Sequence, residues 1–384
     1  MVARAVMMVA LAGWLTSTLY LLLVSVAVVR FRRKRPPGRV SQLPPVTLLK
    51  PVRGIEPRLR DSLESFFRLD YPQLEIIFGA RSNDDPALAI VRELMAIYPH
   101  VPVRVVTCGE PPWSNAKCWS LAKMIGKARF DHLVISDSDV EVAPNYLQQL
   151  IPALLEPGVG CVTTVYRGKP IGGLWALLEA LGMSVEMTSG VLVADMLEGM
   201  KFALGPTMAV SREVLEQIGG FARFAEYCSD DFMLGKRIAD AGYKVILSPH
   251  VIDHVILHES LDQSLIHQTR WMKSTRYSRP KGHLGMVLTF AMPYGVLGLV
   301  AGAAGGKLML GATILAATFL NRILLSLVAG WTAVHDPRSL AYCWLYPLRD
   351  LMGFSFWLAS YFSHQIRWRG ERYRLEVGGK MVKV

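Results

Sequence analysis

The sequence has little cysteine, and its cysteines lack the close spacing of metal-binding motifs. Five occur among the 384 residues, and we expect most of them to be packing residues: Cys108, Cys118, Cys161, Cys228 and Cys343. The odd number and the wide spacing argue against a disulfide framework and against a cysteine-ligated metal site. The sequence therefore predicts free thiols in a reducing compartment.

Charged residues are also scarce, and acidic residues are the scarcer kind. Only 19% of the residues are charged, with 42 Lys and Arg against 31 Asp and Glu, whereas 52% are hydrophobic. The basic residues cluster at the edges of apolar segments instead of along one periodic face, so no nucleic-acid binding is expected. This composition predicts a membrane protein whose polar domain lies beside anionic lipid or an anionic ligand.

What the chain does have is long apolar runs, and one of them lies near the N-terminus. Residues 5–29 are free of charge and exceed the roughly 20 residues that a spanning helix needs. A cleavable signal peptide would carry its charge before a shorter apolar core, so we predict an uncleaved anchor with its flank in residues 1–35. The positive-inside rule places the chain after this anchor in the cytoplasm, because a basic cluster borders the apolar run: Arg30, Arg32, Arg33, Lys34 and Arg35.

Residues 36–283 predict a cytoplasmic α/β domain. Short apolar segments alternate with helical patterns, which is typical of βαβ units around a mostly parallel sheet. A helix over 230–241 ends at Gly242, a glycine suited to a left-handed C-cap, and a strand over 243–248 comes next. The other expected strands are 46–50, 74–80, 103–107 and 132–136, and the other expected helices are 59–69, 86–97 and 116–128.

Residues 284–365 are predicted to return to the membrane, and residues 366–384 form a basic tail. The apolar stretches here are 284–305, 308–330 and 340–362. If the tail lies in the cytoplasm, the number of C-terminal crossings is even. Two crossings with one interfacial or re-entrant segment satisfy that condition, and the sequence does not select which stretch stays inside.

The stretch ISDSDVEV places acidic residues directly after an expected strand. Asp137 and Asp139 follow residues 132–136, at the sheet edge where open α/β sheets bind ligands. Their carboxylates suit Mg²⁺ or Mn²⁺, which prefers a few carboxylates together with phosphate oxygens. The alternative for an isolated Asp-x-Asp is a solvated turn. Glu141, in the same stretch, is expected at the surface.

Further polar groups come from the same sheet edge. Asp84 and Asp85 follow the strand 74–80, although Asn-Asp-Asp-Pro also suits a turn or a helix N-cap. Asn115 and Lys117 open the helix 116–128, where a phosphate would be favoured, and a plain surface helix start is the alternative.

Two more groups come later in the chain. Asp230 and Asp231 begin a helix, where the helix dipole alone favours acids, but a carboxylate there also suits a general base for an acceptor hydroxyl. In HQTRW, Arg270 and Trp271 suit either an interfacial anchor or an arginine facing a diphosphate beside an acceptor pocket. Arg349, next to Asp350 inside an apolar stretch, fits a buried pair, a transport role or a lipid head-group site.

The order of these groups favours sugar transfer from a nucleotide diphosphate donor to a membrane lipid. With them, the chain resembles the ceramide glucosyltransferase family, inverting membrane glycosyltransferases of the GT-A fold. The resemblance covers nearly the whole chain and is carried by LLKPVRGIEPRL, SFFRLDYP, NDDPA, DSDVEV, SDDFMLGKRIADAG, HQTRW and the tail RWRGERYRLEVGG.

The resemblance implies roles for individual residues. Asp85 corresponds to the family's first aspartate, and Asp231 corresponds to its catalytic base. Arg270 and Trp271 close the family's (Q/R)xxRW motif, whose first position here is His267 in place of Gln or Arg. The predicted sites are Asp230, Asp231, Arg270 and Trp271 for catalysis, Lys50, Pro51, Asp84, Asp85, Asn115, Lys117 and Asp137 for the donor, Asp137 and Asp139 for Mn²⁺ or Mg²⁺, and His267 and Arg349 for the acceptor.

The resemblance implies an integral protein of a bacterial inner membrane that transfers a sugar, with glucose favoured, from a UDP-sugar to a ceramide-like lipid. A hopanoid acceptor is an alternative, because the stretch 158–175 is similar to bacterial hopanoid-associated members. A processive polysaccharide synthase would need more spanning helices than the sequence offers. A non-catalytic scaffold or transport subunit is the alternative outside enzymes.

Overall fold

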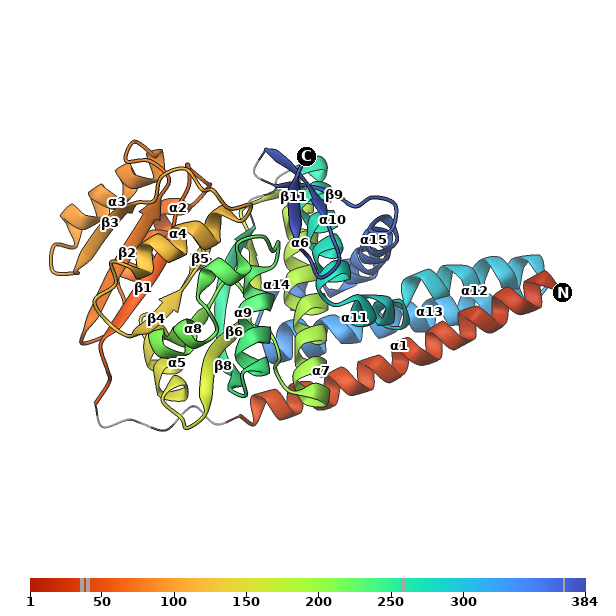
Figure 1. The fold of residues 1–384 in the computed structure, drawn as a ribbon. Helices are drawn as coiled ribbons and strands as arrows, with labels where there is room; N and C mark the ends of the chain where they lie inside the picture. The colour runs from red at the N-terminus through yellow and green to blue at the C-terminus, as the bar shows by residue number, and fades with distance from the viewer. Residues whose placement is uncertain (35–37, 39–41, 257, 259, 369) are drawn as a thin grey trace. The chain divides into compact units, whose positions relative to one another are not determined.

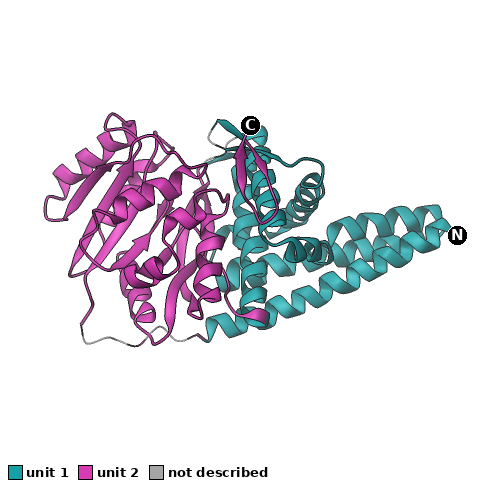
Figure 2. Ribbon diagram, viewed as in Figure 1, with its two compact units in different colours: residues 1–33, 172–197, 258–372 teal, residues 34–171, 198–257, 373–384 magenta. Residues whose placement is uncertain are grey.

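A computed structural model describes residues 1–34, 38, 42–256, 258, 260–368 and 370–384. Arg35 and Pro36, at the first predicted boundary, lie outside the described residues. The chain forms two compact units, shown in Figure 2. We call one the helical unit, residues 1–33, 172–197 and 258–372, and the other the α/β unit, residues 34–171, 198–257 and 373–384. The predicted division into four successive domains stays a prediction.

The α/β unit is built on an eight-stranded sheet of order β3-β2-β1-β4-β7-β6-β8-β5. The pairs β1–β2, β2–β3, β1–β4 and β6–β8 are parallel, whereas β7 runs antiparallel to β4 and β6, and β5 to β8. The sheet is therefore mixed: most of its pairings are parallel, as the sequence predicts, and three pairings are antiparallel. Its strands are β1 Val46–Pro51, β2 Leu74–Ala80, β3 Val103–Thr107, β4 His132–Ile135, β5 Val140–Glu141, β6 Val159–Pro170, β7 Met208–Ser211 and β8 Lys244–Ile256.

Four helices of this unit, α2, α3, α4 and α9, lie where the sequence predicts helices, whereas α5 and α8 are additional. They are α2 Leu59–Phe67, α3 Pro86–Ile97, α4 Ala116–Ile125, α5 Tyr146–Leu154, α8 Arg212–Gln217 and α9 Asp230–Asp240, with a short 3₁₀ turn at Phe221–Phe224. Gly242, after α9, has a φ of +89°, as a left-handed C-cap requires. In β1 and β2 all but Pro51 are buried, because both faces of a central parallel strand are covered.

The end of the chain packs beside the start of α9. Strands β10 Glu371–Leu375 and β11 Met381–Lys383 pair antiparallel. The backbone N–H of Met381 donates to Glu226 O at 2.6 Å, and that of Cys228 donates to Gly379 O at 3.0 Å. The tail therefore supports the loop that leads into α9.

The helical unit contains the apolar segments. In Figure 1, α1, α12 and α13 run side by side, in agreement with their contacts. The elements are α1 Val2–Arg32, α6 Gly173–Leu181, a π-helical segment Gly182–Met187, α7 Thr188–Glu198, α10 Leu261–Ser278, α11 Pro280–Gly285, a 3₁₀ turn Met286–Leu288, α12 Met292–Ala304, α13 Leu308–Leu325, a π-helical segment Ser326–Ala333, α14 Pro337–Ala341, a 3₁₀ turn Cys343–Leu345, α15 Tyr346–Ala359 and β9 Gln365–Trp368.

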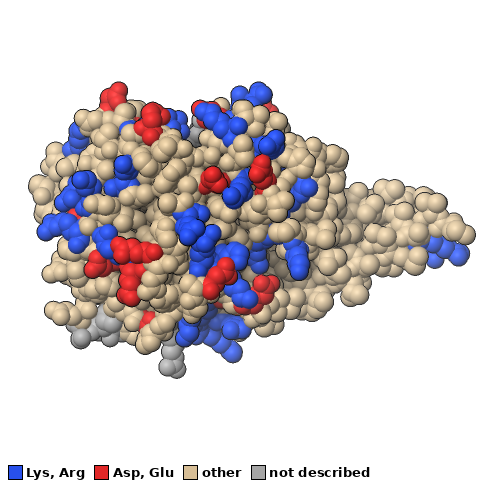
Figure 3. Space-filling model, viewed as in Figure 1, with Lys and Arg blue, Asp and Glu red and all other residues tan. Residues whose placement is uncertain are grey.

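Three helices among the described residues are long and apolar enough to cross a membrane: Val2–Arg32, Gly173–Glu198 and Leu308–Ala333. A pair bent by 43°, Pro280–Leu288 with Met292–Ala304, would be a broken span or a re-entrant loop. Figure 3 shows hardly any charged side chain on the visible surface of α1, α12 and α13 between their two ends. The helix Gly173–Glu198 is not among the segments that the sequence predicts, since Glu179 and Glu186 interrupt its apolar pattern.

Candidate active site

Asp137 and Asp139 lie in the short loop between β4 and β5, at the carboxyl end of β4 as expected. Two backbone hydrogen bonds hold this loop to neighbouring strands. Ser136 N–H donates to Leu49 O at 3.1 Å, and Val255 N–H donates to Asp139 O at 2.8 Å. The loop is therefore fixed to β1 and β8, which keeps both carboxylates at the sheet edge.

Lys117, in the first turn of α4, lies between two of the predicted carboxylates. Its Nζ is 2.6 Å from Asp137 Oδ1 and 3.5 Å from Asp230 Oδ2. Burial disfavours the ammonium, but the attraction of Asp137 and Asp230 outweighs that effect and raises the pKa of Lys117 above its ordinary range. The lysine is thus held protonated at the site.

Lys50, near the end of β1, is fully buried under the same loop. Its Nζ donates to the backbone oxygen of Asp137 at 2.5 Å and lies 3.5 Å from the ring centroid of Phe66. Burial lowers the pKa of Lys50 to about 7, although nearby Asp139 and Asp137 oppose that shift. Its charge therefore depends on what else occupies the site.

Asp230 and Asp231 begin α9. Asp231 Oδ2 accepts from Gly205 N–H at 2.8 Å, and Asp231 Oδ1 accepts from Phe232 N–H at 2.7 Å. Burial, with repulsion from Asp230, raises the pKa of Asp231 to about 6. A Cβ added to Gly205 would lie 3.2 Å from Asp231 Oδ2 and 3.4 Å from Asp137 Oδ2, so both carboxylates border this glycine.

Asn115 joins α4 to the start of α9. It is the N-cap of α4, where its side chain accepts from Cys118 N–H at 3.1 Å. Its amide donates to Tyr227 O at 2.9 Å and to Asp230 Oδ1 at 3.4 Å. Since Asn115 is fully buried and its amide has these partners, the structure shows it positioning Asp230, and its predicted contact with the donor stays a prediction.

The first acidic pair lies at the ends of β1 and β2. Asp85 is the N-cap of α3, and its Oδ1 accepts from Ala87 N–H at 3.0 Å and from Gly54 N–H at 2.8 Å. Asp85 thereby ties the loop after β1 to α3, whereas Asp84 is exposed. Pro51 ends β1 opposite Gly79 of β2. The N-cap that the sequence offers as an alternative is confirmed for Asp85, and donor binding stays a prediction.

Asp139 fits a divalent cation. Its Oδ1 is buried and has no hydrogen-bond partner among the described residues, while its Oδ2 lies 3.6 Å from His254 Nε2. An orphaned buried carboxylate oxygen is costly unless another group or an ion contacts it. Hard oxygen ligands of this kind suit Mg²⁺ or Mn²⁺, with Asp137 close by.

The residues of HQTRW lie in the helical unit, on α10. The ring of His267 is 4.6 Å from that of Trp271, and the guanidinium of Arg270 lies 5.7 Å from the ring of Trp368. His267 Nδ1 is 2.7 Å from Glu179 Oε1. Their predicted roles toward the diphosphate and the acceptor stay predictions.

Arg349 does not pair with its neighbour Asp350. Arg349 Nη2 lies 2.9 Å from Glu186 Oε2, whereas Asp350 pairs with Arg322 at 3.1 Å and accepts from the backbone N–H groups of Ala291 and Met292. Arg349 Nε and Nη1 are buried without a hydrogen-bond partner among the described residues. These two donors are therefore left without a hydrogen bond inside the described part of the helical unit.

Several site residues have no signal in the sequence. Gly205 and His254 lie in segments without a motif, and only the fold brings them to Asp231 and Asp139. Glu141, expected at the surface, instead pairs with Lys169 and lies 3.3 Å from Arg58, because β5 is paired with β8. The five cysteines form no disulfide, and all but Cys343 are buried.

Comparison with known proteins gives a family and a fold. The glycosyl transferase family 21 model matches residues 5–381. Ceramide glucosyltransferase 1 of Caenorhabditis elegans is 27% identical over 248 residues, 63% of this chain and 53% of that protein, so the match spans about half of that relative. Ceramide glucosyltransferase 3 of the same organism is 23% identical over 374 residues, 95% of this chain and 80% of that protein.

Among solved structures, the chain is similar to the mannosyltransferase PcManGT from Pyrobaculum calidifontis, determined with GDP-Man and Mn²⁺. The TM-score is 0.51 at 19% identity, covering 91% of this chain and 98% of that one. At this identity the likeness shows the fold alone. Together with the family match, it confirms the GT-A-like α/β fold with a mixed central sheet.

Proposed function

The chain belongs to glycosyl transferase family 21, and on this premise we propose that it transfers a sugar from a UDP-sugar to the hydroxyl group of a membrane lipid, with inversion. The observation that carries the proposal is the convergence of Asp137, Asp230 and Asp231 on Lys117, with Asp139 beside Asp137. The names of the relatives favour glucose as the sugar and a ceramide-like lipid as the acceptor.

Asp231 is the general base in this proposal. Its carboxylate accepts the proton of the lipid hydroxyl while the hydroxyl oxygen forms a bond to the anomeric carbon. The bond from that carbon to the diphosphate oxygen breaks, and UDP leaves with the electron pair. A base works best with a pKa close to the working pH, and a pKa of about 6 meets that condition.

Lys117 provides positive charge for the donor diphosphate, and Lys50 adds to it when the lysine is protonated. Lys117 stands at the start of α4, where backbone N–H groups also favour an anion. Asp139 and Asp137 would hold Mn²⁺ or Mg²⁺, which when bound neutralises the departing diphosphate. Two backbone N–H groups orient the carboxylate of Asp231 without the help of the ion.

In this proposal, residues of the helical unit bind the lipid acceptor. The unpartnered Nε and Nη1 of Arg349 lie on a helix of the apolar region and offer two hydrogen bonds to the polar part of a lipid. The catalytic unit would lie in the cytoplasm, as the basic residues Arg30 and Arg32 in the last turn of α1 favour.

Product formation tests the proposal. The purified full chain in lipid nanodiscs, with ceramide, UDP-glucose and Mn²⁺, should give a monohexosyl lipid that mass spectrometry detects. Asp139→Ala is the control, and it should reduce the product by at least about 10²-fold, because the leaving diphosphate loses its metal ligand. UDP-sugar consumption without any glycosylated lipid, over a panel that includes hopanoid acceptors, would contradict it.

A further inference from the structure

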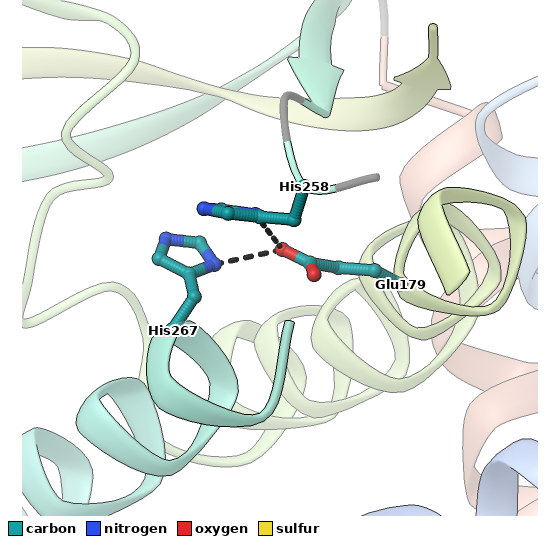
Figure 4. Close-up of side chains that lie close together, drawn as sticks. All are labelled: Glu179, His258 and His267. Carbon is teal, nitrogen blue, oxygen red and sulfur yellow. Dashed lines mark hydrogen bonds and ion pairs between the residues drawn. The ribbon is translucent and has the colours of Figure 1, made fainter. Parts of the chain in front are cut away.

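The helical unit contains a cluster of metal-ligating side chains, of which only His267 has a predicted role in the reaction, toward the acceptor. Glu179 lies on α6, His267 on α10, and His258 on the segment between β8 and α10. Figure 4 shows both imidazole rings facing the carboxylate of Glu179. One ligand atom from each residue lies within 4.8 Å of the other two.

The distances are close to those of a bound ion. Glu179 Oε1 is 3.0 Å from His258 Nδ1 and 2.7 Å from His267 Nδ1, and the two ring centroids are 4.2 Å apart. A tetrahedral zinc ion at about 2.0–2.1 Å from each ligand sets ligand atoms about 3.3 Å apart. Small side-chain rotations, a few tenths of an ångström for the two oxygen–nitrogen distances, would admit the ion.

Hydrogen bonds from neighbouring side chains orient the carboxylate of Glu179. Glu179 is 3% exposed, and its Oε2 accepts from Ser264 Oγ at 2.6 Å. Gln268 Nε2 in turn donates to Ser264 Oγ at 2.7 Å. Ligating carboxylates are usually held in this way by hydrogen bonds on the atom that does not bind the metal. Oε1 is thereby directed toward the two imidazoles.

We propose that Glu179, His258 and His267 bind a divalent transition-metal ion, with zinc as the best fit. Two imidazoles and one carboxylate form a ligand set that leaves one coordination position open for water or another oxygen ligand. Imidazole ligands favour zinc over Mg²⁺ or Mn²⁺. The site therefore differs in chemistry from the carboxylate site at Asp139, and it joins α6, α10 and the segment before α10.

Zinc content tests the proposal on the full chain in detergent. An Asp139→Ala background removes one of the two carboxylates of the other candidate metal site, and the protein is stripped with chelator, dialysed against Zn²⁺ and freed of unbound ion. We expect about one zinc per chain in this background, and a loss to buffer level after His258→Ala or His267→Gln. Glutamine can still donate a hydrogen bond to Glu179. If the cluster were held by hydrogen bonds alone and bound no metal, His267→Gln would therefore leave the zinc content unchanged.

His364→Ala, which removes a histidine of the same unit outside the cluster, should leave the zinc content unchanged. Equal zinc in the cluster variants and in His364→Ala would overturn the proposal, as would a background protein that retains no zinc. If the cluster variants aggregate, X-ray absorption of the zinc-loaded background protein decides. A spectrum that shows histidine ligands on the zinc supports the proposed site. A spectrum that shows only oxygen ligands, or sulfur ligands, contradicts it.

Discussion

Single residues set the protonation states on which the proposed chemistry depends. Lys117 stays charged because Asp137 and Asp230 face it, and Asp231 has a raised pKa because it is partly buried and lies beside Asp230. The site therefore contains one lysine that stays charged and one carboxylate that can exchange a proton near neutral pH. The pKa of Asp231 therefore predicts how the transfer rate depends on pH.

The rate should rise with pH through the pKa of Asp231. A base must be ionised to accept a proton, so kcat/KM for the lipid at saturating donor should increase about tenfold per pH unit below about 6 and level off above it. The measurement is initial rate of glycolipid formation across this range. A profile that is flat between about pH 5 and 7 would show that Asp231 is not the titrating base.

The sequence predicts the acidic side chains of the site but not their partners. Asp137 and Asp231 can be found because each stands at the edge of a recognisable strand or helix. Gly205 and His254 cannot, since their positions depend on how β7 and β8 join the sheet. The surface position expected for Glu141 is wrong for the same reason, because its pairing with Lys169 needs the β5–β8 contact.

At the scale of elements, α9 is held in place by a close backbone approach. A Cβ added to Gly235 would lie 2.1 Å from Ala203 N and 2.3 Å from Phe202 C. Backbone atoms cannot move aside as a flexible side chain can, so the glycine lets α9 approach residues 202–203. The helix carries Asp230 and Asp231, and its position therefore sets theirs.

Gly235→Ala should displace α9 and lower both stability and activity. Overpacking of this kind costs about 1–3 kcal/mol, and it exceeds the gain of about 1 kcal/mol from better helix propensity. Thermal unfolding in detergent and the transfer rate measure the two effects. Gly285→Ala is the control, because nothing lies within 4 Å of its added Cβ. Equal unfolding temperatures for the two variants would contradict this packing account.

Local patterns identify most elements of the α/β unit, including β1, β2, β3, α3 and the end of α9. They miss the helix Gly173–Glu198, because Glu179 and Glu186 interrupt its apolar run. Both acids have charged or ionisable partners in the structure, His267 and Arg349, and these contacts are long-range. A local sequence pattern cannot show that an acidic side chain will pair with a residue that is distant in the sequence.

At the scale of the whole molecule, the two units are interleaved in the sequence. The chain leaves the α/β unit at Ile171, returns at Glu198 and leaves again after Leu257. The patterns of single sequence segments cannot predict that the chain passes back and forth between the two units. This path depends on which helices and strands pack together within each unit. In the proposed function, the apolar helices of the helical unit would serve the lipid acceptor and the α/β unit would bind the nucleotide donor.

Arg349→Lys should separate acceptor binding from donor binding. Lysine keeps a positive charge near Glu186 but removes the Nε and Nη1 donors. We expect KM for the lipid to rise about tenfold, a cost of about 1.4 kcal/mol for a lost hydrogen bond, while KM for UDP-glucose stays unchanged. Steady-state kinetics in nanodiscs measure both constants. A change confined to the donor KM would count against a role in acceptor binding.

The most direct test of the account is glycolipid formation by Asp231→Asn, compared with wild type in the same nanodiscs with UDP-glucose and ceramide. Asparagine retains an oxygen that can accept from Gly205 N–H but cannot take the proton of the hydroxyl. The account predicts a fall of about 10²–10⁴-fold in turnover with UDP affinity within a few-fold of wild type. Wild-type turnover by this variant would contradict the central claim.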